Sequence, residues 1–404
     1  MKGREEDGSA ADLSRRARAL EVSPTVAMAQ RAAALRASGQ AVLDFSVGEP
    51  DQGTPRRVME AAVRALEEGR TRYTGTAGIP ELRAAVASRY AQDFAVRFAP
   101  EEVAISVGGK QALYLVCQAL LDDGDEVVIP SPYWPTFAEA VRLAGGRPVV
   151  APTLETDGFK VTAGMIGKAT TERTRAVLIN SPCNPTGAVI DPEDLLVIGD
   201  MAVRRRFTIL YDDTYAHLTF EGGADSALQA LRESAGERFV ILGTASKSYC
   251  MTGWRIGWVL GPRALIDACA ALVSHSTQHP ATFAQVGAVE ALTGPQAGVQ
   301  DLRGEYRRRR DFIQPALAAI PGVTCIPPAG GFYAFPNVAR HLSAAVPDTL
   351  ALALRLLEET KVALVPGEGF GAPGYVRLSF ARSMDDLQEG ARRIAAFLAG
   401  LRGD

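Results

Sequence analysis

The stretch Thr244-Ala245-Ser246-Lys247-Ser248-Tyr249 decides how the rest of this sequence is interpreted. It follows the apolar run Phe239–Leu242, which predicts a buried strand, so Lys247 stands at a strand end among small hydroxyl side chains. A lysine in a turn is usually exposed and hydrated. When a lysine is partly desolvated, however, its pKa falls and its amine becomes a nucleophile that can form a Schiff base. The other motifs of the chain favour this chemical interpretation.

Short strand-like runs alternate with helical patterns on both sides of this stretch. The expected strands are Val103–Val107, Glu126–Ile129, Pro148–Val150, Ala176–Ile179, Thr208–Leu210, Phe239–Leu242 and Ile256–Leu260. Such alternation predicts βαβ units and a mostly parallel sheet, and therefore an α/β fold. Ligands bind sheets of this kind at the carboxyl ends of the strands, which is where Lys247 stands.

A change in the pattern of expected strands and helices along the chain predicts two domains. Residues 53–300 carry the alternating strands and helices and form the large domain. A long arginine-rich helix is expected over Asp301–Leu317, and short strands mixed with helices follow it. We therefore expect a smaller α+β domain over 301–404, which the N-terminal segment 1–52 joins.

Composition argues against several classes of protein. The 404 residues are 47% hydrophobic and 22% charged, which is typical of a globular protein with a large core. The formal net charge of −3 provides no basic field for nucleic acid or an anionic membrane. The five cysteines have no C-x-x-C spacing and indicate reduced thiols. With neither a leader nor an apolar run long enough to span a membrane, we expect a cytoplasmic protein.

Polar motifs follow several of the other expected strands. Ser106–Gln111 passes from a strand into a helix, where backbone N–H groups and the helix dipole form an anion site. It is not a Walker A loop, because Gln111 stands where Ser or Thr is required. An ordinary tight turn is the alternative. In Ser181–Gly187, Asn184 presents an amide at a strand end, although a simple proline-rich loop would have the same composition.

Carboxylates follow the strand Thr208–Leu210. Because adjacent strand residues point to opposite faces, Asp212 and Asp213 are not expected to form one metal clamp. One buried carboxylate there can instead hold a protonated heterocyclic nitrogen, with Tyr215 further along the turn. A solvated Asp-Asp turn is the alternative interpretation.

The strand-like run Gly374–Phe380 carries one arginine among apolar residues. The fork of a buried guanidinium matches a carboxylate bidentately, so Arg377 is a candidate for a substrate carboxylate. The alternative is an internal salt bridge. The preceding Gly367–Gly371 imitates a dinucleotide fingerprint, but it precedes a strand instead of a helix, and we reject that interpretation.

These motifs, in this order, resemble those of the pyridoxal-phosphate-dependent aminotransferases of class I/II, fold type I. The likeness is closest to bacterial aspartate aminotransferases of the thermophile type, and it extends from about Ser23 to the C-terminus. The stretches that carry it are Ser46–Asp51, Tyr73 with Ala77–Arg83, Val107–Leu113, Ser131–Trp134, Asn184–Gly187, Asp212–Tyr215, the Lys247 stretch and Val376–Ser379. The resemblance implies a mostly parallel seven-stranded sheet between helices, a smaller α+β domain, and a homodimer.

The resemblance also implies a role for each motif. Lys247 would bind pyridoxal phosphate, and Asp212 would pair with the pyridinium nitrogen. Tyr215 and Asn184 would hydrogen-bond the phenolic oxygen, and Trp134 would stack on the ring. The groups implied to hold the phosphate are the amides of Gly109 and Lys110, the side chains of Thr244, Ser246 and Arg255, and Tyr73 from the second subunit.

The substrate contacts are implied in the same way. Arg377, Asn184 and the backbone at Gly48 would bind the α-carboxylate of an amino acid, and Lys110 and Thr25 would bind a side-chain carboxylate. That favours aspartate or glutamate as one substrate. Lys247 would act as the general base in a ping-pong exchange with a 2-oxo acid.

Several positions depart from the family pattern near the expected substrate pocket, and they leave the second substrate open. These are Asp51-Gln52-Gly53, Cys183, Thr214 and the loop Ser276–Pro280. One alternative is therefore a pyridoxal-phosphate-dependent oxidase, cyclase or lyase in secondary metabolism. Another is a cofactor-binding regulator, which the acidic charge and the lack of a helix-turn-helix pattern disfavour. His275 and His279 lie beside Pro280, so we expect no metal site from them.

Overall fold

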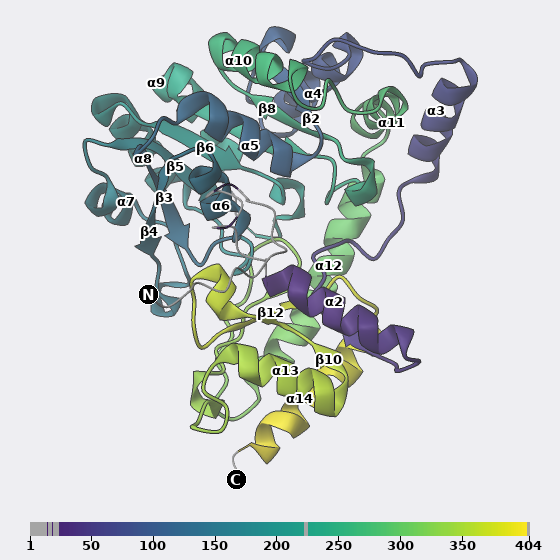
Figure 1. Cartoon of the computed structure of the whole chain (residues 1–404), viewed down its shortest axis with the longest axis vertical. Helices are drawn as coiled ribbons and strands as arrows, with labels where there is room; N and C mark the ends of the chain where they lie inside the picture. Colours follow the sequence, from purple (N-terminus) through teal and green to yellow (C-terminus); the bar gives the residue numbers. More distant parts are fainter. Residues whose placement is uncertain (1–13, 15–17, 19–23, 222–224, 402–404) are drawn as a thin grey trace, which may run out of the picture.

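A computed structural model gives the fold of the chain (Figure 1). It describes residues 14, 18, 24–221 and 225–401. Figure 1 shows a large sheet with its helices in the upper part and a smaller group of helices and short strands below, with one long helix running between them. Within the described residues, no helix is long and apolar enough to cross a membrane.

The main sheet is mostly parallel, as the sequence predicts. In the described part of the chain its strands, in spatial order, are β2 (Val103–Ser106), β8 (Gly257–Leu260), β7 (Phe239–Thr244), β6 (Thr208–Asp212), β5 (Thr174–Asn180), β3 (Glu126–Ser131) and β4 (Arg147–Pro152). Strand β8 is antiparallel to both of its neighbours, and the pairs from β7 to β4 are parallel. All seven expected strands are confirmed in place.

Helices cover both faces of this sheet because alternate strand residues are apolar on both sides. Ala176 and Leu178 face one layer, whereas Val177 and Ile179 face the other. The first layer contains α5 (Gly109–Leu120), α6 (Thr136–Leu143) and α10 (Arg263–Ser274). The second contains α4 (Pro80–Asp93), α7 (Ala163–Ala169), α8 (Pro192–Arg205), α9 (Asp225–Ala235) and α11 (Thr282–Thr293).

The lower group combines the C-terminal part of the chain with an N-terminal helix. Its strands are β9 (Tyr333–Ala334), β11 (Val365–Pro366) and β12 (Val376–Ser379), which are antiparallel, and β1 (Leu43–Asp44), which pairs parallel with β10 (Val362–Ala363). Its helices are α2 (Pro24–Ala37), α13 (Thr349–Thr360) and α14 (Met384–Gly400). Met28 and Ala32 of α2 pack against Ala353 and Leu357 of α13, so the N-terminal segment contacts this group.

Two further helices connect or flank the groups. Helix α12 (Ala297–Ala318) is the long helix between them, and the proposed domain boundary at residue 301 falls inside it. Helix α3 (Arg56–Glu67) lies at the margin of the molecule in Figure 1. Short 3-10 turns occupy Pro100–Glu102, Glu155–Asp157, Ala216–Leu218, Gly236–Arg238, Thr252–Trp254, Ala339–His341 and Gly367–Phe370.

Candidate active site

A cavity of about 230 Å³ lies at the carboxyl ends of the central strands. Its lining comes from both groups of elements, since β5, β6 and β7 contribute from above and β9 and β12 from below. The residues that line it are Gly48, Gly109, Lys110, Trp134, Phe137, Asn180, Asn184, Asp212, Thr214, Tyr215, Thr244, Ser246, Lys247, Arg255, Tyr333 and Arg377. All site residues predicted from the sequence therefore meet here, except Tyr73 and Thr25.

Lys247 follows the end of β7, and its side chain points into this cavity. Its Nζ donates a hydrogen bond to the carbonyl oxygen of Gly48 at 2.6 Å. Burial lowers the pKa of the Lys247 amine to about 8, and the positive charges of Arg377 and Arg255 act in the same direction. The carboxylates of Glu49 and Asp212 oppose this shift. The amine is thus available in its neutral, nucleophilic form near neutral pH.

The two carboxylates at the end of β6 face opposite sides, as strand alternation predicts. Asp212 is buried in the cavity wall, where its Oδ1 accepts from the backbone N–H of Thr214 at 3.0 Å. Burial raises the pKa of the Asp212 carboxyl, and the charge of Lys247 partly offsets that rise. Asp213 instead accepts a hydrogen bond from the Tyr90 hydroxyl at 2.5 Å, behind the sheet.

Arg377 is 2% exposed, and its positively charged side chain is part of the cavity lining. It donates to Asn184 Oδ1 at 3.0 Å and to the carbonyl of Ser46 at 2.7 Å. Among the described residues no carboxylate forms an ion pair with it, and its buried Nε has no hydrogen-bond partner. The internal salt bridge considered from the sequence is therefore absent from this part of the chain. A buried guanidinium with a free donor is a site for an anionic ligand.

The opposite end of the cavity concentrates donors and positive charge. Helix α5 begins at Gly109, so its first backbone N–H groups point toward the cavity end beside Lys110. A Cβ on residue 108 would lie 2.4 Å from Arg255 Nη2, and the backbone φ of Gly108 is +79°. Only a glycine therefore allows the Arg255 guanidinium to lie this close to the backbone. The hydroxyls of Thr244 and Ser246 lie 2.8 Å apart in the same place. Together these groups form a cradle for an anion such as a phosphate.

The family model described as aminotransferase class I and II matches residues 40–394 of this chain. The chain belongs to this family. It is therefore a pyridoxal-phosphate-dependent transaminase, so the regulator hypothesis has no support, and the expected α/β fold of the family is confirmed.

Known aminotransferases match nearly the whole chain. The aspartate aminotransferase of Geobacillus stearothermophilus is 42% identical over 387 residues, which cover 96% of this chain and 98% of that one. The aspartate/prephenate aminotransferase of Thermus thermophilus is 43% identical over 389 residues, with the same coverage of 96% and 98%. The structure of the Thermus thermophilus aspartate aminotransferase with maleate has a TM-score of 0.90 and 41% identity, and covers 96% of this chain and 100% of that chain.

The residues of this aminotransferase fit pyridoxal phosphate. The cradle at Gly109 and Arg255 suits the phosphate, because no carboxylate among the described residues pairs with Arg255 or Lys110. The buried carboxylate of Asp212 suits a protonated ring nitrogen, because that nitrogen would supply a positively charged partner for the buried negative charge. Lys247 lies in the same cavity as both groups.

Two predicted site residues lie outside the cavity lining. Tyr73 is 84% exposed, and its ring lies edge-on to that of His279 with 5.8 Å between the centroids. His279 also accepts from the backbone N–H of Thr74 through Nε2 at 3.2 Å, and its Nδ1 lies 2.7 Å from the Pro280 carbonyl, so both ring nitrogens are engaged within the chain. Thr25 belongs to α2, but its side chain is outside the described part of the structure.

Sequence reasoning missed some residues of the lining. Asn180, the last residue of β5, donates to the carbonyl of Asp212 at 3.2 Å and accepts from the backbone N–H of Asn184 at 2.8 Å. It therefore holds two predicted site segments together, and its place at a strand end was the available signal. Tyr333 was also missed, because it lies in an apolar run that is indistinguishable from a core strand.

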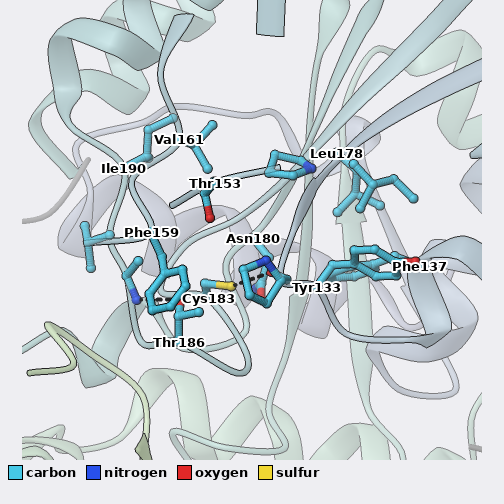
Figure 2. A pocket seen from close by; sticks show the side chains of 15 residues that line it. Tyr133, Phe137, Thr153, Phe159, Val161, Leu178, Asn180, Cys183, Thr186 and Ile190 are labelled. Carbon is cyan, nitrogen blue, oxygen red and sulfur yellow. Dashed lines mark hydrogen bonds between the residues drawn. The ribbon is translucent and has the colours of Figure 1, made fainter. Parts of the chain in front are cut away.

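Figure 2 shows the side chains that line a second, smaller cavity, which shares Phe137 and Asn180 with the active-site cavity. The Cys183 thiol points toward the Pro132 carbonyl at 3.5 Å, and burial raises the pKa of this thiol. The cavity volume of about 20 Å³ is enough for about one water molecule. This cavity is therefore part of the packing beneath the active site and not a substrate pocket.

The lowered pKa of Lys247 gives a pH prediction for the apoenzyme. The labelling rate of this amine by acetic anhydride should rise with pH and level off above about 8, since the neutral amine is the reactive form. The labelling rate of the exposed Lys160 amine should keep rising above that pH, because its hydrogen bond with Asp191 raises its pKa. Mass spectrometry of both peptides from the same samples measures this. A Lys247 labelling rate with the same pH dependence as that of Lys160 would contradict the burial argument.

Proposed function

We propose that this aminotransferase exchanges amino groups between a dicarboxylic L-amino acid, aspartate or glutamate, and a 2-oxo acid by a ping-pong mechanism. The observation that carries this proposal is that one cavity holds two cations without a carboxylate partner in addition to Arg255 of the phosphate cradle. Arg377 has a buried donor without a partner, and Lys110 has no carboxylate partner among the described residues. Two separate cations match a substrate with two carboxylates.

The roles of the chain's own residues follow from the geometry of the cavity. Arg377 and Asn184 bind the α-carboxylate and fix the substrate Cα relative to Lys247. Asp212 holds the proton of the ring nitrogen. The bound pyridoxal phosphate supplies an electron sink. The Lys247 amine, with a pKa of about 8, takes the Cα proton as a general base near neutral pH and returns it later in the cycle.

Lys110 is the candidate that selects the dicarboxylic side chain. Lys110 is exposed at the mouth of the cavity, and its Nζ lies 5.0 Å from the Trp134 ring centroid. Partial burial lowers the pKa of this amine, as does the charge of Arg255. A substrate carboxylate would relieve this unfavourable environment. The similar Thermus thermophilus enzyme was solved with maleate, which is itself a dicarboxylate.

Replacing Lys110 with alanine tests this selection. We expect kcat/KM for aspartate to fall about 10- to 100-fold, because a charged hydrogen bond contributes about 1.5–3 kcal/mol. The value for alanine as amino donor should change less than about threefold, since no side-chain carboxylate is lost. Half-reactions followed by the spectral change of the cofactor measure both donors. An equal loss for aspartate and alanine would remove Lys110 from substrate recognition.

The same half-reactions separate transamination from other chemistry on this scaffold. A transaminase requires an added 2-oxo acid to complete its cycle and consumes no oxygen. An oxidase, cyclase or lyase would turn over aspartate or glutamate without that acceptor. No described residue specifically favours one of these alternatives over transamination.

A homodimer would complete the site. Helix α3 exposes Met59, Val63 and Leu66, which border a groove of about 930 Å³ that continues to Arg255. A second copy of the chain could cover this apolar groove, which reaches the phosphate cradle. Tyr73 is exposed on the loop after α3, so it is free to contact the phosphate site of the partner.

We also propose a cytoplasmic location. All five cysteines of the chain are free, and Cys117, Cys269 and Cys325 are buried. Free thiols in this number fit a reducing compartment, where thiols persist.

A further inference from the structure

Tyr333 lies between the proposed cofactor-binding residue Tyr215 and the proposed carboxylate-binding residue Arg377. It belongs to β9 and pairs with Ser379 of β12, two residues after Arg377. Tyr333 is 1% exposed and is one of the residues that line the cavity. The hydroxyl oxygen is 2.9 Å from that of Tyr215, and the ring centroid is 4.5 Å from Arg377 Cζ. One side chain therefore contacts both the proposed cofactor-binding tyrosine and the proposed carboxylate-binding arginine.

The position of this hydroxyl is tightly constrained. A Cβ built on Gly48 would lie 2.3 Å from Tyr333 Oη, so the Gly48 backbone passes directly against it. The rings of Tyr215 and Tyr333 are nearly perpendicular, at 80° with 5.8 Å between centroids. The hydroxyl is thus held between Gly48 and Tyr215, and any side chain at position 48 would displace it.

We propose that Tyr333 is a positioning residue that donates its hydroxyl hydrogen to Tyr215 and so directs the Tyr215 hydroxyl toward the phenolic oxygen of pyridoxal phosphate. This inference rests on the proposed role of Tyr215. Two hydroxyls that share one hydrogen bond have one donor between them. If Tyr215 donates to the cofactor, its oxygen must accept from Tyr333. In such a chain the first hydrogen bond polarises and strengthens the second.

The proposal predicts a spectroscopic change with a defined sign. Donation by Tyr215 withdraws electron density from the phenolic oxygen, which then holds the proton on the Lys247 nitrogen less tightly. Without the Tyr333 hydroxyl this donation weakens, and that proton is held more tightly. The pH midpoint of the visible band of the holoenzyme should therefore rise in Tyr333→Phe. We expect a rise of up to about 0.3 pH unit, because cooperative strengthening adds about 10–30% to a neutral hydrogen bond.

Four variants of the holoenzyme test this by pH titration of the visible band. Tyr215→Phe should raise the midpoint more than Tyr333→Phe. The double variant should match Tyr215→Phe alone, because Tyr333 acts through Tyr215. Tyr375→Phe is the control, since its hydroxyl donates to Glu155 at 2.8 Å, outside the cavity lining, and its midpoint should equal that of the wild type.

Each contrary outcome has a distinct meaning. A midpoint shift in Tyr215→Phe with none in Tyr333→Phe overturns the role of Tyr333, and so do additive shifts in the double variant. No shift in Tyr215→Phe overturns the proposed contact between Tyr215 and the cofactor, on which the role of Tyr333 depends. These two failures are therefore distinguishable.

The ring of Tyr333 gives a second, independent readout through Arg377. Maleate binding to the holoenzyme should be unchanged within twofold in Tyr333→Phe, because the aromatic face remains. In Tyr333→Leu it should weaken about 2- to 30-fold, as expected for the loss of a buried cation–π contact. Thermal unfolding of both variants verifies that they are folded. Equal maleate affinity in Tyr333→Leu and the wild type would show that the ring does not support Arg377.

Discussion

Replacing Lys247 with alanine is expected to lower kcat for transamination by about 10⁴-fold or more, because one change removes both a general base and a nucleophile. The amine is the group in this cavity whose pKa is lowered to about 8, which suits proton transfer near neutral pH. The variant should also lose the visible band that borohydride abolishes in the wild type. Single-turnover half-reactions with aspartate measure the loss.

Two matched variants make the Lys247 result specific. Lys168→Ala removes an exposed lysine of α7 and should leave kcat within twofold of the wild type. Lys110→Ala removes the other lysine that lines the cavity, and it should retain the borohydride-sensitive band. If Lys247→Ala keeps that band and its activity, the assignment of the reactive amine is wrong.

Replacing Arg377 with leucine is expected to lower kcat/KM for aspartate by about 10³-fold, since truncating one partner of a buried charge pair costs about 2–5 kcal/mol. The guanidinium would provide the main charge for the α-carboxylate, and its buried Nε has no other partner in the described chain. Arg377→Lys should recover only part of this loss, because an ammonium cannot bind a carboxylate bidentately. Steady-state kinetics with varied aspartate measure both variants.

Arg382→Leu is the matched control for this arginine. Arg382 also donates to a backbone carbonyl, that of Asp44, at 2.8 Å, but it does not line the cavity. Its kcat/KM should stay within about threefold of the wild type. Equal losses in Arg377→Leu and Arg382→Leu would indicate that Arg377 acts through stability of the fold and not through the substrate.

The sequence predicted the large sheet well because its strands are short apolar runs separated by helices. Every expected strand is present. Strand β5 starts two residues before Ala176 and ends one residue beyond Ile179, and β7 ends two residues beyond Leu242. The direction of β8 was not predicted, because apolar periodicity is the same in parallel and antiparallel strands. It pairs antiparallel with β7, and the connection over residues 245–256 contains the short turn Thr252–Trp254 and no α-helix that could form a crossover.

The site was predictable where each residue directly follows a strand. Asp212 is the last residue of β6 and Lys247 follows the end of the adjacent parallel strand β7, so their proximity follows from the topology. Tyr333 depends on a different relation, because β9 reaches the cavity from the lower group of elements. No local pattern encodes that long-range contact, and a tyrosine in an apolar run most often belongs to a core.

The central claim is that one particular amine of this chain binds the cofactor. Borohydride reduction of the holoenzyme, followed by proteolysis and mass spectrometry, tests it most directly, because six lysines are available and two of them line the cavity. We predict a single modified peptide in which the adduct is on Lys247. An adduct on Lys110, or on any other lysine of the chain, would contradict this account.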